Sequence, residues 1–174
     1  MKYFIVTLLL LILISCNSKE EENQMDKMIL GSTVENINNS QYSVIRFKIN
    51  DEECFATINQ YFNNFKYKSD FPCSLWITVE TKDKNTNGHP TDQEAELYNS
   101  LEDSIVLQFD TKTPYCYIGR TTRNGYREIM FYVSDRDLAA KLMDEYIKES
   151  KYDRKIEYDI RLDKNWESVS GLVQ

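Results

Sequence analysis

Histidine is almost missing from this chain, because His89 is the only one among 174 residues. A Ser–His or Cys–His catalytic pair would have to use His89, and no nucleophile motif such as Gly-x-Ser-x-Gly accompanies it. There is also no phosphate-binding glycine loop and no His, Cys and carboxylate spacing typical of a metal site. We therefore expect no catalytic residue, no metal and no cofactor, and we interpret His89 as an exposed loop histidine.

Positive charge is in deficit as well. Lys and Arg together number 21 against 28 Asp and Glu, which gives a net charge of −7. Proteins that bind nucleic acid need a basic surface to neutralise the phosphates. The composition therefore argues against a nucleic-acid partner.

The N-terminus carries a single, largely apolar run at residues 3–14, preceded by Lys2. A membrane-spanning helix needs about 20 such residues, so residues 1–15 are predicted to be a signal peptide. The run ends in Leu13-Ile14-Ser15-Cys16, which resembles a bacterial lipobox, whose cysteine thiol receives a diacylglycerol before cleavage. We expect Cys16 to be lipidated and to hold the protein at a membrane.

Residues 16–41 contain few apolar side chains and no clear period, which predicts a flexible tether. Lys19-Glu20-Glu21-Glu22 resembles the acidic export signal of some bacterial surface lipoproteins, and a solvated spacer is an equal alternative. The expected location is the outer membrane, with the protein facing either the periplasm or the cell surface.

Three cysteines follow the tether, Cys54, Cys73 and Cys116. An odd number allows at most one disulfide within a monomer, and the expected compartment would permit one. Their spacing fits no zinc pattern. Buried free thiols are the favoured interpretation, and a single disulfide is left open.

Residues 42–174 are predicted to form one α+β domain. Alternating apolar residues predict strands at 42–49, 54–58, 75–79, 115–123, 126–133 and 156–162. The first helix is expected behind Thr91, whose Thr-x-x-Glu spacing is that of a capping box. The second is expected to begin at Ser134 or Asp135. Residues 60–73 are not assigned.

From Leu75 onward the order is strand, helix, strand, strand, helix, strand. With right-handed connections this order predicts a ferredoxin-like antiparallel sheet with both helices on one face. The N-terminal hairpin is expected either to extend this sheet or to fold over its other face.

Asn124-Gly125 is a strong signal for a two-residue type I′ turn. Such a turn places Arg120 opposite Ile129 and Thr122 opposite Arg127. Strict alternation then predicts that the helix-side face carries Cys116, Ile118, Arg120, Arg127, Ile129, Phe131 and Val133.

Arg120 and Arg127 are therefore expected beneath the first helix, which carries Glu94, Glu102 and Asp103. A buried guanidinium needs carboxylate or carbonyl partners, so we interpret these residues as a structural ion-pair network between helix and hairpin. An anion-binding pocket at the same residues is the alternative. Glu102 and Asp103 are not expected to form a catalytic pair, because adjacent helix residues point in different directions.

The opposite face of the sheet is predicted to carry aromatic side chains of the types enriched in binding interfaces. They are Trp76, Tyr117, Tyr126 and Tyr132. We expect them either to bind a protein partner or to be covered by the N-terminal hairpin or residues 61–71.

Several short motifs, taken in order, resemble a bacterial family, the domain of unknown function 695. They are Leu75-Trp76, Gly88, Leu101-Glu102-Asp103, Gly119-Arg120 with Thr122, Gly125 and Arg127, Phe131-Tyr132, and Asp163 with Trp166. The resemblance extends from about residue 42 to residue 166. It implies an α+β domain and no established activity.

Together these features predict a lipid-anchored, non-catalytic binding protein of the bacterial envelope with a protein partner. A specific form of this hypothesis is an immunity-type protein that neutralises a toxin. The alternative is a small-ligand binder or hydrolase that uses the region of Arg120 and Arg127, and a structural envelope protein is a third hypothesis.

The lipidation hypothesis makes a direct prediction. The mature chain should begin at Cys16 and carry the added mass of its acyl chains, because the thiol is modified before the signal peptide is removed. Intact-mass spectrometry of the membrane fraction measures this. An unmodified chain that begins at another residue would contradict the prediction.

Overall fold

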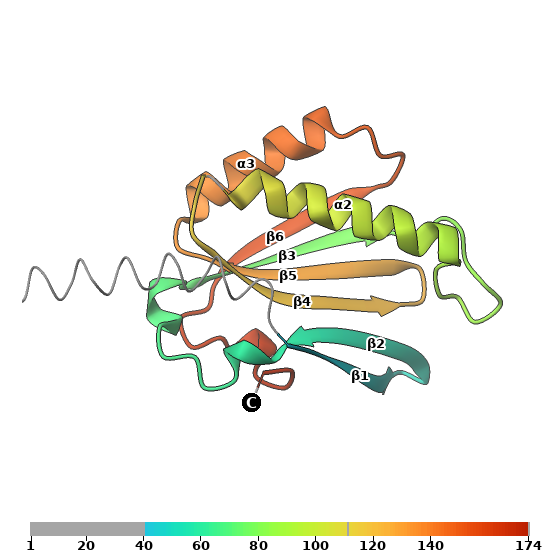
Figure 1. The fold of residues 1–174 in the computed structure, drawn as a ribbon, viewed down its shortest axis with the longest axis horizontal. Coiled ribbons are helices and arrows are strands. Elements are labelled where there is room, and N and C mark those ends of the chain that lie inside the picture. The colour runs from blue at the N-terminus through green and yellow to red at the C-terminus, as the bar shows by residue number, and fades with distance from the viewer. Residues whose placement is uncertain (1–40, 111, 174) are drawn as a thin grey trace, which may run out of the picture. The chain divides into compact units, whose positions relative to one another are not determined.

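The computed structural model describes residues 41–110 and 112–173 (Figure 1). The expected signal peptide, the lipidation site Cys16 and nearly all of the predicted tether lie outside these residues. Within the described part of the chain, no helix has both the length and the apolar character needed to cross a bilayer. The described residues form an α+β domain.

A six-stranded antiparallel sheet is the frame of this domain. Its strands are β1 (Tyr42–Ile49), β2 (Glu52–Asn59), β3 (Cys73–Glu80), β4 (Tyr115–Arg123), β5 (Tyr126–Val133) and β6 (Ile156–Leu162). The spatial order is β1-β2-β4-β5-β3-β6, so β1 and β6 are the two edges. The N-terminal hairpin therefore extends the sheet through the pairing of β2 with β4 (Figure 1).

Two helices, α2 (Asp92–Asp110) and α3 (Arg136–Glu149), lie on one face of the sheet (Figure 1). The Asp135 carboxylate caps α3 by accepting from the backbone N–H groups of Asp137 and Leu138. Thr91 caps α2, because its Oγ1 accepts from the backbone N–H of Glu94 at 3.3 Å. The Glu94 side chain does not complete the expected capping box, because it pairs with Arg154.

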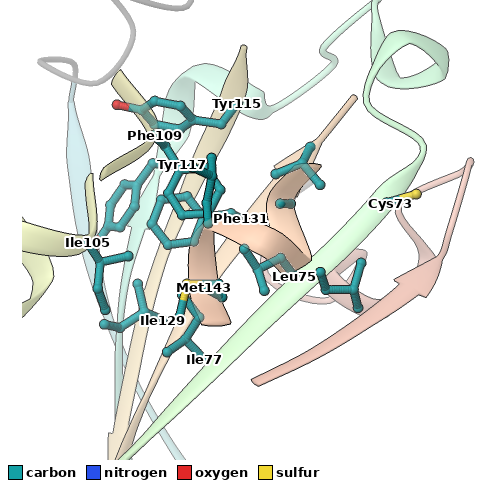
Figure 2. Close-up of a cluster of buried hydrophobic side chains, with 14 of the residues drawn as sticks. Cys73, Leu75, Ile77, Ile105, Phe109, Tyr115, Tyr117, Ile129, Phe131 and Met143 are labelled. Carbon is teal, nitrogen blue, oxygen red and sulfur yellow. The ribbon is translucent and has the colours of Figure 1, made fainter. Parts of the chain in front are cut away.

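The main core fills the space between the helices and the sheet (Figure 2). Aliphatic residues of β3 and β5 form its floor, and an aromatic group closes one end. The rings of Phe109 and Phe131 stack there with centroids 5.8 Å apart, and the edge of Tyr117 meets Phe131 at 5.2 Å. The core draws on β3, β4, β5 and β6 but on no side chain of β1 or β2.

The register of the β4–β5 hairpin near its turn is as predicted, with Arg120 opposite Ile129 and Thr122 opposite Arg127. The pairing then shifts by one residue between Tyr117 and Gly119. Such a bulge reverses which face every residue beyond it occupies.

The bulge corrects the faces expected from strict alternation. Tyr117 lies opposite Phe131 on the helix side, and Cys116 lies opposite Tyr132 on the other side. The predicted positions of Tyr117 and Cys116 were therefore wrong. Ile118 falls within the bulge, and it is buried without joining the helix-side core.

A second, smaller core lies on the other face of the sheet, where residues 60–72 meet the C-terminal residues 163–173 (Figure 1). Trp166 is at its centre: its ring stacks on Tyr132 at 4.1 Å, and its Nε1 donates to the carbonyl oxygen of Phe71 at 3.0 Å. Phe62 and Phe65 pack against the same indole. Of the unassigned residues 60–73, residues 60–72 thus form a cover built on two short 3₁₀ turns, Gln60–Phe62 and Lys68–Asp70, and Cys73 begins β3.

The cysteines Cys54, Cys73 and Cys116 are free, buried thiols, as the sequence favoured. Burial raises the pKa of Cys116 well above its ordinary value and also raises the pKa of Cys73. Because the thiolate is the reactive form, these side chains act as small core residues.

Gly119 should be the most demanding position for a substitution in the sheet. It has a φ of +142°, and a Cβ there would lie 2.1 Å from the carbonyl oxygen of Thr57 on β2. Gly119→Ala should therefore force the two strands apart and lower the free energy of unfolding by about 2–4 kcal/mol. Gly171→Ala is the matched control, because no atom lies within 4 Å of its added Cβ. Equal urea midpoints for the two variants would show that the close approach is not needed.

Candidate functional site

A charged cluster joins α2 to the β4–β5 hairpin. The Glu102 side chain is only 8% exposed, and its Oε1 accepts from Arg120 Nη1 at 2.9 Å and from the Tyr117 hydroxyl. Its Oε2 lies 3.8 Å from Arg127 Nη1. One carboxylate thus stands between two guanidinium groups on adjacent strands.

Arg127 is held by further contacts of the protein itself. Its Nε donates to Thr122 Oγ1 at 3.2 Å, its Nη1 donates to Asn99 Oδ1 at 3.3 Å, and its guanidinium lies 4.6 Å from the centre of the Tyr98 ring. Its side chain is 7% exposed. These contacts stabilise a cation that has been removed from water.

Burial and neighbouring charges shift the pKa values of the two arginines in opposite directions. Burial, followed by the charge of Arg120, lowers the pKa of Arg127. Burial also works against the charge of Arg120, but the Glu102 carboxylate outweighs it and raises the pKa of Arg120. Burial and the charge of Glu102 together raise the pKa of Tyr117 far above its usual value. Tyr117 therefore stays protonated and acts as a hydrogen-bond donor to Glu102.

Two acidic residues expected at this cluster lie elsewhere. Asp103 is exposed on α2, whereas its neighbour Glu102 is buried, because neighbouring helix positions diverge. Glu94 is fully buried, but it binds Arg154, whose Nε donates to Glu94 Oε1 at 2.8 Å. The bond from Arg154 lowers the pKa of Glu94 and raises that of Arg154. Arg154 lies in the link before β6, where no periodic pattern marks it.

The proposed aromatic partner face does not exist as one surface. Tyr117 belongs to the helix-side core because of the bulge, and Tyr132 is completely covered by Trp166. Of the four aromatic residues, only Trp76 and Tyr126 are partly accessible on the face away from the helices, and both are half-buried. The expected cover by residues 61–71 is therefore present over part of this face, with the C-terminal residues added to it.

His89 is not the exposed loop histidine that the sequence indicated. Its side chain is 13% exposed, its ring meets the edge of Phe55 at 5.2 Å, and its Nε2 lies 4.0 Å from Glu53 Oε2. It borders an open polar cavity of about 430 Å³, which is also lined by Lys48, Asp51, Glu52, Glu53, Asn87 and Asn124. Over the described residues, no three His, Cys, Asp or Glu side chains are grouped as a metal site requires.

The two edges of the sheet differ in how many large apolar side chains they expose. Along β6, Lys155 pairs with Glu157 at 2.7 Å and Arg161 pairs with Asp159. Charged side chains of this kind protect a sheet edge from pairing with other strands. β6 also exposes Leu162 (69%), whereas β1 carries the Arg46–Glu53 ion pair and exposes Tyr42 (40%), Val44 (71%) and Ile49 (38%).

The backbone of β1 also points outward at alternate residues. The carbonyl oxygen of Gln41 accepts from the N–H of Gln60 at 3.0 Å, so the odd-numbered residues of β1 turn their backbone groups towards β2. Alternation then directs the N–H and C=O groups of Val44, Arg46 and Lys48 away from the sheet. This row can accept an added strand.

Residues 40–169 match the family described as "Family of unknown function (DUF695)". The chain belongs to this family. The match contains all six strands and both helices and confirms the resemblance inferred from the motifs. No curated protein and no solved structure matches the chain.

The motifs on which the resemblance rested have clear structural uses in this chain. Gly125 forms the hairpin turn with a φ of +90°, and Trp166 anchors the second core. Asp163 holds the C-terminal turn, accepting from the Tyr132 hydroxyl at 2.6 Å and from the backbone N–H of Ser168 at 3.0 Å. Burial opposes its charge, but these hydrogen bonds prevail and lower the pKa of Asp163 to about 2.

The charged cluster of this DUF695 chain predicts a large difference between two adjacent acidic residues. Glu102→Ala should lower the free energy of unfolding by about 3–5 kcal/mol, because it leaves the buried Arg127 without a countercharge. Asp103→Ala is the control, since an exposed residue should change it by less than about 0.5 kcal/mol. Urea denaturation measures both. Indistinguishable midpoints would show that the cluster contributes nothing to stability.

Proposed function

We propose that this DUF695 chain is a lipid-anchored, non-catalytic binding protein of the bacterial envelope, and that β1 is its binding edge. The observation that carries the proposal is the contrast between the two sheet edges. β6 carries two ion pairs and exposes one large apolar side chain, Leu162, whereas β1 carries the Arg46–Glu53 ion pair and exposes three large apolar side chains beside outward-facing backbone groups. An exposed apolar edge strand promotes aggregation unless a partner covers it.

Strand addition would explain both features of β1. Backbone hydrogen bonds to an added strand supply affinity, and the alternating side chains supply specificity. The helix-side core includes no residue of the β1–β2 hairpin, which lies beyond the two helices (Figure 1). A partner at β1 would therefore meet Val44 directly and could reach Arg120, which is 30% exposed.

The proposed lipidation site lies close to β1 in the sequence. Cys16 and Tyr42 are 26 residues apart, which allows a separation of at most about 90 Å. The domain could then reach a partner near the same membrane. The net charge of −7 suits an immunity-type role against a basic toxin, which is the specific form of the proposal.

A catalytic or anion-binding role for Arg120 and Arg127 has weaker support. The guanidinium of Arg127 is engaged by Thr122 and Asn99, and that of Arg120 by Glu102. Guanidinium groups held by partners within the fold are typical of a structural network. We also propose a ferredoxin-like unit made of β3–β6 with α2 and α3. The order β4-β5-β3-β6, with α2 following β3 and α3 following β5, supports it.

Photocrosslinking in intact cells tests the binding edge. A photoreactive amino acid is placed at Val44 on β1 or at Leu162 on β6, which are 71% and 69% exposed and therefore matched in accessibility. We expect a discrete crosslinked product from Val44 and none from Leu162. The same products at both positions, or none at Val44, would count against β1 as a binding edge.

A further inference from the structure

We infer that the strand that pairs with β1 is β1 of a second copy of this chain, antiparallel to the first about a two-fold axis at Ile45. The inference rests on the proposed function, because it takes β1 as the binding edge. It adds the identity of the partner and the register of the contact.

Symmetry limits how two copies of β1 can pair. A two-fold axis perpendicular to the sheet keeps the helix faces of both copies on the same side. Residues that lie opposite one another must then belong to the same face of their own strand. On β1 the helix-side residues include Val44, Arg46 and Lys48, since Val44 pairs with Thr57 and Thr57 pairs with Arg120. Even-numbered residues can therefore meet only even-numbered residues.

Charge selects among the registers that remain. An axis at Arg46 would place Arg46 against its own copy, and an axis at Phe47 would place Arg46 against Lys48. Like charges directly opposite one another are destabilising. An axis at Ile45 instead places Arg46 opposite Val44 and Lys48 opposite Tyr42.

The register at Ile45 is also the longest one without opposed cations. It pairs residues 42–48 of the two copies, whereas an axis at Val44 pairs only residues 42–46. A cation beside an aromatic ring is favourable, and this hairpin already contains one such contact, Arg46 over Phe55 at 5.8 Å. On the other face, Ile45 would meet Ile45 and Phe47 would meet Ser43. Within a single copy, Ile45 and Phe47 are each only half-buried.

The backbone supports the same register. The outward N–H and C=O groups of Val44 would exchange hydrogen bonds with those of Arg46 in the second copy. Ile45, whose backbone groups turn towards β2, would form the non-hydrogen-bonded pair on the axis, where opposite Cα atoms are about 4.5 Å apart. Anchors in one bilayer would raise the effective concentration of the two edges for each other.

Disulfide trapping tests this pair in the full chain within its membrane. Ile45→Cys is combined with Cys54→Ser, which removes the neighbouring native thiol and keeps a donor near the Glu52 carbonyl. Cβ atoms of a non-hydrogen-bonded pair lie about 4.5–5.5 Å apart, close to the disulfide range of about 3.5–4.5 Å. Mild oxidation should shift the protein to twice its monomer mass. Asp159→Cys in the same background, exposed on β6, should remain monomeric.

A second variant tests the charge argument without a crosslink. Val44→Lys would place a cation opposite Arg46 of the second copy, so it should convert the purified full chain in detergent from dimer to monomer. Sedimentation measures this change. Val44→Thr, which keeps the size and β-branching, should remain dimeric. The inference is overturned if the wild-type chain sediments as a monomer and the Ile45→Cys variant forms no more dimer than the Asp159→Cys control.

The outcome separates the inference from the broader proposal. If Val44 photocrosslinks to a different protein while Ile45→Cys gives no dimer, the second copy is excluded and β1 remains a binding edge. If neither position gives a product, both the inference and the proposed function fail.

Discussion

The close approach of β2 to β4 at Gly119 is the contact on which much of this structure depends. A side chain there would collide with the carbonyl oxygen of Thr57, so the N-terminal hairpin can join the sheet only because residue 119 is glycine. The bulge beside Gly119 also turns Tyr117 to the helix side, where its hydroxyl reaches Glu102. Glu102 in turn holds Arg120, the residue after Gly119. One backbone constraint therefore links hairpin docking, the aromatic end of the core and the charged cluster.

Features that depend on local sequence were predicted well, and features that depend on distant contacts were not. Asn124-Gly125 determines its own turn and the pairing next to it, so Arg120 opposite Ile129 was correct. The bulge lies beside Gly119, which packs against Thr57 of the distant strand β2, and alternation alone cannot reveal it. The Thr91 cap was predicted correctly, but Arg154 draws the Glu94 side chain away from it. Local spacing says nothing about such a partner.

The candidate site shows the same division. The sequence placed two arginines and an acidic helix together, and the structure brings Glu102 to both guanidinium groups. It did not reveal which strands are edges, because hydrophobic alternation looks alike in an edge strand and in a central strand with one wet face. Val44 gained its significance only from the strand order. The cover over Tyr132 was also missed in part, because Trp166 comes from the far end of the chain.

A chain in which one edge strand exposes three large apolar side chains and the other exposes one favours a closed pair over an open polymer. Pairing through β1 consumes the apolar edge of both copies and leaves β6, with its ion pairs, at both ends of the joined sheet. A two-fold contact of this kind is self-complementary and stops at two copies. With the axis at Ile45, the two Tyr42 residues lie three positions to either side, so the tethers would begin about 20 Å apart along the strands. The 26 positions from Cys16 to Tyr42 would span that separation, so the proposed lipid anchors of both copies would enter one membrane without straining the pair.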